Sequence, residues 1–246
     1  MNYCELKMTC REGVYREKVL IDRQYALGDV ARLMQRITEK AMSELGISYS
    51  RLEEKHLIWV MCFMEIRINR MPSDGEILEI YTWPGKERFG MYSRRMVMYS
   101  PKGGECLIES TVLSSAVDRD TRKMITPAAS EISFPIVEFA DEPAFPKLYE
   151  KGIRTPLTQQ HEVSIHEIDI NEHVNNSFYL DWAENLLSDS PDRMQRAGAV
   201  RRIWINYEKE ARLGDVIVFQ YGIEKDTLFV KGRVGDDSCF KALLSA

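Results

Sequence analysis

The first stretch of patterned hydrophobic residues lies between positions 27 and 45. Its apolar side chains recur at spacings of three and four residues, at Leu27, Val30, Ala31, Met34, Ile37, Ala41, Met42 and Leu45. This spacing places them on one face of an α-helix, which predicts an amphipathic helix with a buried apolar face. Gly46 follows directly, and glycine in this position is typical of a helix end.

Four apolar runs after this helix have the length and the β-branched and aromatic content of strands. Loops rich in proline and glycine separate them, and Pro84-Gly85 forms one of these loops. Short connections join antiparallel neighbours, so the pattern predicts an antiparallel meander. The predicted strands are 59–68, 77–83, 91–99 and 106–117.

The same order of elements recurs in the C-terminal part. A predicted helix at 177–187 comes before four further strand-like runs, at 200–207, 216–223, 227–234 and 239–244. The segment Ile66-Arg67-Ile68-Asn69 also resembles Ile203-Trp204-Ile205-Asn206, which is a weak sign of duplication. Between the two parts, five of the nine prolines fall within 127–158, which predicts an extended and stiff connector.

A helix followed by a curled antiparallel sheet, present twice, has a simple physical solution. Each sheet wraps its own helix, and the two sheets join edge to edge. The expected fold is therefore α+β, a double (tandem) hotdog. We assign residues 1–126 to the N-terminal hotdog, 127–158 to a proline-rich linker and 159–246 to the C-terminal hotdog.

Composition narrows the functional classes. The chain has 246 residues, 44% of them hydrophobic, and a formal net charge of −5 with both signs interspersed, which argues against nucleic acid as a partner. Its five cysteines are scattered without a C-x-x-C pair, which favours a reducing cytoplasm over a disulfide framework. We expect no export signal and no membrane insertion, because no apolar run approaches the ~20 residues of a membrane span.

The segment 166–179 is the densest in groups that titrate or form hydrogen bonds. If residues 167–173 are extended, alternate side chains point to the same side, so Asp169, Asn171 and His173 converge on one face. The predicted helix follows directly. Its unpaired N-terminal amides and positive dipole end would then lie beside His173 and stabilise developing negative charge.

Two simpler interpretations of this segment remain open. The polar residues can merely form turns and helix caps, with Asn175 or Asn176 as the N-cap. A metal site is also conceivable, although its histidines lack a recognised ligand spacing and fall on different strand faces, so we expect no metal and no cofactor. The residues of that site would be His161, His166 and His173 with Glu167 or Asp169.

Family resemblance adds a specific chemistry. The run Asp169-Ile170-Asn171-Glu172-His173-Val174-Asn175-Asn176-x-x-Tyr179 resembles the signature of the acyl-acyl carrier protein (ACP) thioesterases, bacterial and plastid. The family pattern continues with a tyrosine, a carboxylate and often a cysteine. The chain matches it as Tyr207-Glu208-Lys209-Glu210 but has Ala211 at the cysteine position.

This resemblance implies hydrolysis of a fatty acyl-ACP thioester, as in fatty acid biosynthesis, with ACP as partner. Glu210 would activate a water or attack the carbonyl, and His173 would hold Glu210 or the water and protonate the departing thiol. Asp169 would orient His173, and Asn171 would bind the water or the oxyanion. Ala211 excludes the alternative family mechanism, in which the cysteine is the nucleophile.

The first half lacks this set, since Met71 stands opposite Glu210 in the sequence echo, so one active site per chain is expected. The first half would hold the acyl chain, and weak candidates for its pocket are Met34, Met61, Phe63, Met64 and Trp83. Candidates for docking the acidic carrier are Lys86, Arg88, Arg94, Arg95, Arg193, Arg196, Arg201 and Arg202. Both a monomer and a homodimer fit this plan.

Other functions of the same fold stay open at this stage. A coenzyme A thioesterase would use the same chemistry on a different carrier, and a hotdog dehydratase would use the histidine and a carboxylate on a hydroxyacyl thioester. A non-catalytic acyl-thioester sensor would keep the pocket but not the charged groups. The presence of Asp169, His173 and Glu210 argues against the sensor.

Overall fold

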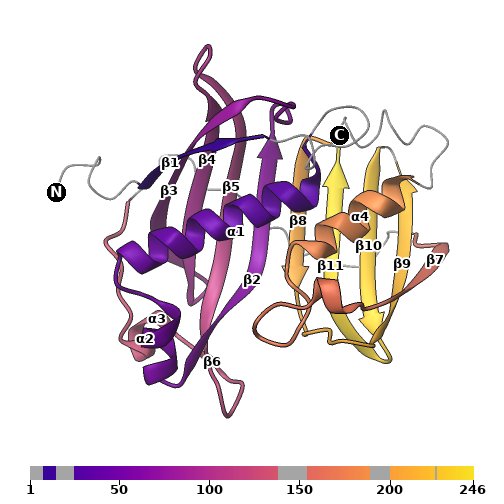
Figure 1. Ribbon diagram of the computed structural model, residues 1–246. Helices are drawn as coiled ribbons and strands as arrows, with labels where there is room; N and C mark the ends of the chain where they lie inside the picture. The colour runs from indigo at the N-terminus through magenta and orange to yellow at the C-terminus, as the bar shows by residue number, and fades with distance from the viewer. Residues whose placement is uncertain (1–7, 15–24, 138–153, 189–199, 225) are drawn as a thin grey trace.

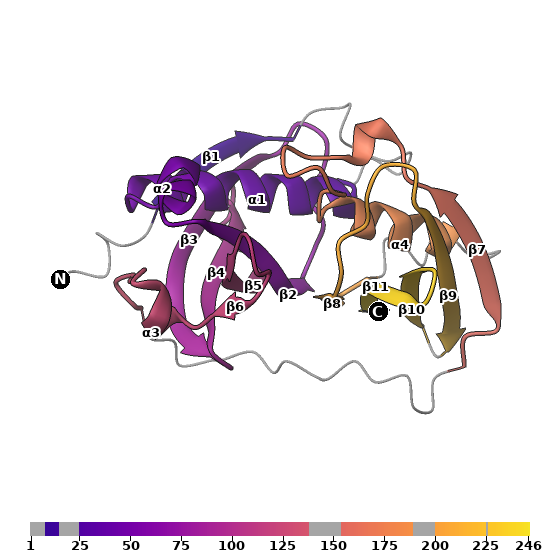
Figure 2. The same ribbon diagram turned by 90° about the horizontal axis from the view of Figure 1, so that it is seen from below.

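The computed structural model describes residues 8–14, 25–137, 154–188, 200–224 and 226–246. Within them, eleven strands form one antiparallel sheet in the order β1-β3-β4-β5-β2-β8-β11-β10-β9-β7, with β6 paired to β5. The long helices α1 and α4 lie side by side on the same face of this curved sheet (Figure 1 and Figure 2). This arrangement is the predicted double hotdog.

The N-terminal half follows the predicted order. Its elements are β1 (Met8–Gly13), α1 (Leu27–Glu44), α2 (Tyr49–Glu54), β2 (Leu57–Ile68), β3 (Ile77–Arg88), β4 (Met91–Ser100), β5 (Glu105–Asp118), β6 (Met124–Ile125) and α3 (Pro127–Ser130). The predicted helix is confirmed, and every residue of its apolar face except the half-buried Leu45 is buried. Gly46 closes the helix with a φ of 77°.

The loop predicted at Pro84-Gly85 is wrong. Strand β3 continues through both residues, with Pro84 paired to Arg94 and Gly85 to Ser93. A proline fits here because, among the residues that the structure describes, β1 pairs with β3 as far as Thr82, and none of them donates or accepts across from the Pro84 nitrogen on that side.

The C-terminal half contains β7 (Leu157–Glu162), the 3-10 helix η2 (Ile165–Glu167), α4 (Phe178–Ser188), β8 (Arg202–Tyr207), β9 (Val216–Glu224), β10 (Thr227–Val234) and β11 (Asp237–Ser245). The helix and four strands predicted here are confirmed, with ends shifted by one or two residues. Strand β7 was not predicted, because its side chains are mostly exposed and carry no apolar alternation.

The connector between the halves is only partly described. Its first residues, Pro127–Ser130, form α3 rather than an extended segment, and proline is well suited to the first turn of a helix. Its last residues enter β7, and residues 138–153 lie outside the described part of the chain. The domain boundaries given above stay predictions.

The two halves join where β2 pairs with β8. Met64 faces Ile205 and Ile66 faces Ile203 in this pairing, and all four side chains are buried. The segments that echo each other in sequence therefore meet at the junction of the sheet. The predicted edge-to-edge joining is confirmed.

The two long helices cross at Gly28. A Cβ atom placed on Gly28 would lie 1.7 Å from Oδ1 of Asp181, so only glycine permits this approach of α1 to α4. Arg32 forms an ion pair with the same carboxylate, and the Leu27 amide donates to Oε2 of Glu184 at 3.1 Å. Polar contacts thus fix the crossing while the sheet buries the apolar faces.

The junction gives a stability prediction. Replacing Ile66, which is 1% exposed, by alanine leaves a cavity between the halves and should lower the free energy of unfolding by about 3 kcal/mol in urea denaturation. The matched control Ile77→Ala removes the same atoms from a side chain that is 57% exposed and should change it by less than about 0.5 kcal/mol. Equal effects of the two changes would contradict the assignment of the junction as core.

Candidate active site

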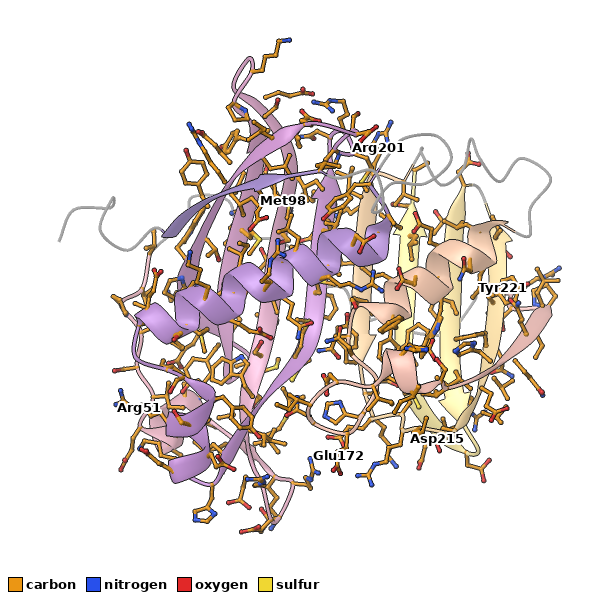
Figure 3. All side chains as sticks on the ribbon, viewed as in Figure 1. Arg51, Met98, Glu172, Arg201, Asp215 and Tyr221 are labelled. Atoms are coloured by element: carbon orange, nitrogen blue, oxygen red, sulfur yellow. The ribbon has the colours of Figure 1, made fainter. Side chains whose placement is uncertain are left out.

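The motif segment folds as a tight turn after η2, so of the two conformations left open by the sequence it adopts the turn and not the extended one. The Asp169 amide donates to the His173 carbonyl, and the Glu172 amide donates to the Asp169 carbonyl, each at 3.0 Å. Glu172 has a left-handed φ of 65°, and Figure 3 labels it at the lower edge of the molecule, between the two halves. The Asp169 Oδ1 accepts from the Asn171 amide at 2.8 Å, a side-chain turn that aspartate favours.

This turn places His173 between two carboxylates. Its Nδ1 lies 3.8 Å from Oδ1 of Asp169, and its Nε2 lies 3.7 Å from Oε1 of Glu210. These separations are those of ion pairs rather than hydrogen bonds, and such contacts often shorten when a substrate binds. The three groups therefore form an Asp169–His173–Glu210 chain. The turn brings Asp169 and His173 together, and not the alternation of side chains along a strand.

Glu210 also contacts a residue that sequence reasoning missed. Arg122, in the turn between β5 and β6 of the first half, donates to Oε1 of Glu210 at 3.0 Å. Arg212 lies 3.6 Å from the other carboxylate oxygen. Arg122 and Glu210 are 88 positions apart, so no local pattern in the sequence connects them.

Backbone contacts hold the turn against the segment after β8 that carries Glu210. The Val174 amide donates to the carbonyl of Ala211 at 2.8 Å, and the Ala211 side chain is fully buried. Where the family pattern often has a cysteine, this chain therefore has a packed methyl group. Cys239, on neighbouring β11, is 1% exposed, and burial raises the pKa of its thiol, which makes it a poor nucleophile.

A buried carboxylate anchors the other end of the turn. Glu167 is 6% exposed and accepts hydrogen bonds from Nε2 of His161, Nε1 of Trp182 and the Ser164 amide, at 2.7 to 2.9 Å. Burial raises the pKa of this carboxyl, but these hydrogen bonds outweigh it, so the pKa lies below its usual value. The Glu167 carbonyl in turn accepts from the Asn175 amide at 2.9 Å.

The helix cap differs from the prediction. Ser177, rather than Asn175 or Asn176, directly precedes α4, and its carbonyl accepts from the Asp181 amide. Asn175 instead supports Ser177, because its Oδ1 accepts from the Ser177 amide at 3.0 Å and from the hydroxyl at 2.8 Å. Asn175 therefore does accept the hydrogen bonds of a cap, but it accepts them from Ser177, which comes before the first residue of α4.

A cavity of about 440 Å³ adjoins the turn. Residues of α1, α2, β2, β4 and β5 form most of its wall, and Asp169, Asn171, Asn176 and Tyr207 form the end nearest to the second half. Of the five weak pocket candidates, three line this cavity and two do not. The three are Met34, Met61 and Met64, and the two are Phe63 and Trp83.

The hydroxyl of Tyr207 donates to the carbonyl of Asn176 at 3.1 Å. Burial raises the pKa of Tyr207, so its phenol stays protonated and remains a donor. This bond ties the end of β8 to the residues just before α4, where both elements meet the cavity.

The described residues contain no group of three histidine, cysteine, aspartate or glutamate side chains that could hold a metal ion. His161 contacts Glu167, whereas His173 contacts Asp169 and Glu210, so the two rings belong to separate clusters. His166 is exposed. Within the same residues, no helix has the length and apolar character needed to cross a membrane.

Comparison with known sequences assigns both halves to one family. Residues 13–133 match the N-terminal domain of acyl-ACP thioesterases, and residues 150–233 match the C-terminal domain. The chain belongs to the acyl-ACP thioesterase family. The two matches together cover most of the chain.

Curated relatives of this acyl-ACP thioesterase family member include plant chloroplast proteins. A chloroplast acyl-[acyl-carrier-protein] hydrolase of Cuphea viscosissima is 26% identical over 91% of this chain and 55% of its own length. The chloroplast oleoyl-acyl carrier protein thioesterase 2 of Arabidopsis thaliana is 24% identical over 82% of this chain and 61% of its own length. The chain thus spans little more than half the length of these relatives.

Solved structures with the same fold include two thioesterases. An acyl-ACP thioesterase from Bacteroides thetaiotaomicron superposes with a TM-score of 0.81 at 19% identity, covering 100% of this chain and 99% of that one. The 12:0-ACP thioesterase from Umbellularia californica gives a TM-score of 0.80 at 19% identity, covering 98% and 96%. At this level of identity, the likeness establishes the double hotdog fold.

Several residues expected to dock the carrier are unsuited to it. Arg94 is only 8% exposed, the Arg95 side chain is 12% exposed and pairs with Glu109, and Arg202 pairs with the buried Glu65. Arg201 is exposed, but Figure 3 shows it at the opposite end of the molecule from Glu172. Arg193 and Arg196 lie outside the described residues.

The buried Glu167 gives a pH-dependent prediction. Glu167→Gln removes the charged acceptor and should lower the free energy of unfolding by about 1 to 3 kcal/mol near neutral pH. The pKa of this carboxyl is lower in the folded than in the unfolded chain, where it is about 4.3. The stabilisation is therefore full above that value and is lost as the pH falls through the folded pKa.

Urea unfolding between pH 7 and pH 3 measures this difference. The gap between wild type and Glu167→Gln should narrow at the acidic end, while the exposed control Glu162→Gln should follow wild type throughout. A gap that stays constant over the whole range would show that the charged form of Glu167 is not what stabilises the turn.

Proposed function

We propose that the chain hydrolyses fatty acyl-ACP thioesters to a free fatty acid and ACP. One observation carries the proposal: the Asp169–His173–Glu210 chain adjoins an apolar cavity at its end nearest to the second half. The relatives are named acyl-ACP hydrolases and thioesterases, which supports the same reaction. Cys62, Cys106 and Cys239 are free thiols, which supports a reducing cytoplasm as its location.

In the proposed reaction, Glu210 accepts a proton from a water as that water attacks the thioester carbonyl carbon. The C–S bond of the tetrahedral intermediate then breaks, and His173 supplies the proton that the departing thiolate takes up. Glu210 is 3.7 Å from His173, so the two groups can share and pass this proton. Direct attack by Glu210 is the variant of the same scheme in which the carboxylate itself forms the first bond.

Asp169 and Asn171 support this chemistry from the turn. Asp169 faces Nδ1 of His173 and thereby favours the tautomer that leaves Nε2 toward Glu210. Asn171 lines the cavity, where its side-chain amide is placed to donate to the carbonyl oxygen as negative charge develops there. The strength of such a donor depends on its being fixed in advance, and the bond from the Asn171 backbone amide to Asp169 fixes the backbone that carries it.

The acyl chain occupies the cavity beneath α1. Met34 of α1 and Met64 of β2 form apolar walls there, and Met61 extends the same wall. The flexible thioether side chains of methionine adapt to an acyl chain at little energetic cost. The first half thus binds the substrate tail while the second half supplies the chemistry, with one active site per chain.

We further propose Arg122 and Arg212 as carrier contacts in place of the buried arginines. Their side chains are 52% and 66% exposed, and both lie within 4 Å of Glu210. ACP is acidic, so exposed guanidinium groups at the catalytic carboxylate attract it toward the correct end of the cavity. The ion pair with Arg122 also links the carrier surface directly to the catalytic residue.

The carboxylate assignment predicts a specific loss of turnover. Glu210→Gln keeps the shape but removes the base, so kcat for release of free thiol from acyl-ACP should fall about 10²- to 10⁴-fold with little change in KM. The matched control is Glu208→Gln, two residues earlier, where the glutamate pairs with Lys241 and should be dispensable. Near-normal turnover in Glu210→Gln would overturn this assignment, and no thiol release by wild type would overturn the hydrolase proposal.

The orientation of His173 gives a second prediction. Asp169→Asn should lower kcat about 10- to 100-fold, because an amide at this position no longer holds the imidazole in the required tautomer. The exposed neighbour Glu172→Gln in the same turn should keep kcat within about twofold. Steady-state kinetics of the two variants separates orientation of His173 from general damage to the turn. Equal kcat in Asp169→Asn and wild type would refute the orienting role.

A further inference from the structure

A buried arginine lines the acyl cavity far from the catalytic turn. Arg94 of β4 is 8% exposed, and it shares the inner face of the sheet with Tyr92 and Met96, since alternate residues of a strand point the same way. This face lies beneath α1, where Met42 packs against the guanidinium. The position would ordinarily hold an apolar side chain.

The guanidinium has only weak partners. Nη1 donates to the hydroxyl of Thr82 at 3.4 Å, and Nη2 approaches the thioether sulfur of Met42 at 3.5 Å. No carboxylate of the described residues pairs with Arg94. Burial alone lowers the pKa of Arg94 to about 10, without an acidic neighbour that would raise it again. A buried and unpaired charge is costly, so its natural partner is something that enters the cavity.

The register of the sheet gives the distance from Arg94 to β8, the strand that ends beside the catalytic turn. Cross-strand partners run from Arg94 through Val112 of β5 and Met64 of β2 to Ile205 of β8, two residues before Tyr207 at the catalytic end. Three strand spacings of about 4.8 Å separate β4 from β8, which is roughly 14 Å. Along this row, Arg94, Val112 and Met64 line the cavity that adjoins the turn, so an acyl chain that follows the row from the turn would reach Arg94.

We infer that Arg94 forms a subsite for an oxygen-bearing group on the acyl chain, remote from the thioester, and that a terminal carboxylate fits it best. This inference rests on the proposed function, because it names the substrate class of the same site. A guanidinium binds a carboxylate through two parallel hydrogen bonds, and here its desolvation has already occurred on folding. A hydroxyl would accept one such bond, and a plain methyl end would accept none.

Three acyl-ACP substrates of matched length test the inference: a plain chain, one ending in a hydroxyl and one ending in a carboxylate. Lengths are varied so that the chain end spans the roughly 14 Å to Arg94. Wild type should prefer the carboxylate end over the plain end by at least about tenfold in kcat/KM, because a buried donor is left unpaired by the plain chain. The hydroxyl end should rank between them.

The variants assign this preference to one side chain. Arg94→Met should reverse the order, because kcat/KM falls for the carboxylate-ended substrate and rises for the plain one. An apolar residue of this size suits the buried site, so the variant should fold. Arg94→Lys keeps the positive charge but cannot form the two parallel hydrogen bonds of a guanidinium, so its preference for the carboxylate end should lie between those of wild type and Arg94→Met. Arg95→Met is the matched control, since Arg95 pairs with Glu109 outside the cavity wall, and it should keep the wild-type order.

Binding of the free acids provides a readout that does not need turnover. Calorimetry should show an α,ω-dicarboxylic acid binding wild type at least about tenfold more tightly than the monocarboxylic acid of equal length, with the difference absent in Arg94→Met. Hydrolysis of all three substrates at equal rates, together with equal binding of both acids, would overturn the inference and leave the hydrolase proposal intact. Tighter dicarboxylate binding without any hydrolysis would overturn the hydrolase proposal and keep the Arg94 subsite.

Discussion

The pairing of β2 with β8 is the constraint on which the rest of the structure depends. Buried side chains such as Ile66 and Ile203 face each other across this pair and make one continuous sheet from the two halves. The same pairing places the cavity beneath α1 directly beside the turn that carries His173. A binding cavity from one half and a charged cluster from the other thus become a single site.

The site combines rigid anchoring with an accessible reacting group. Buried Glu167 and the carbonyl of Ala211 fix the two ends of the turn, whereas the Glu210 side chain remains 31% exposed between Arg122 and His173. Fixed donors and orienting groups lower a reaction barrier more than mobile ones, because they need no reorganisation in the transition state. The packed methyl group of Ala211 leaves this chemistry to carboxylates and histidine.

Hydrophobic periodicity predicted α1 and most of the strands, since these elements bury one continuous face and local spacing records it. It failed at Pro84, where β3 continues through a proline next to the place where the described part of β1 pairs with it, and this depends on another strand. The residues of the motif segment were recognisable from sequence, but the sequence left a turn and an extended segment both open, because Glu172 adopts a left-handed conformation without being glycine. Arg122 and the inward position of Arg94 depend on tertiary packing, which local patterns do not encode.

The central claim is that one site, built from both halves, holds the acyl chain beneath α1 and its thioester at the Asp169–His173–Glu210 chain. A crystal structure with a non-hydrolysable acyl-carrier analogue tests it most directly. We expect the acyl chain to lie between Met34 and Met64. The thioester mimic should lie within hydrogen-bond reach of Asn171, and also of Glu210 or of a water held by Glu210. An acyl chain bound elsewhere, or a mimic turned away from Glu210, would contradict it.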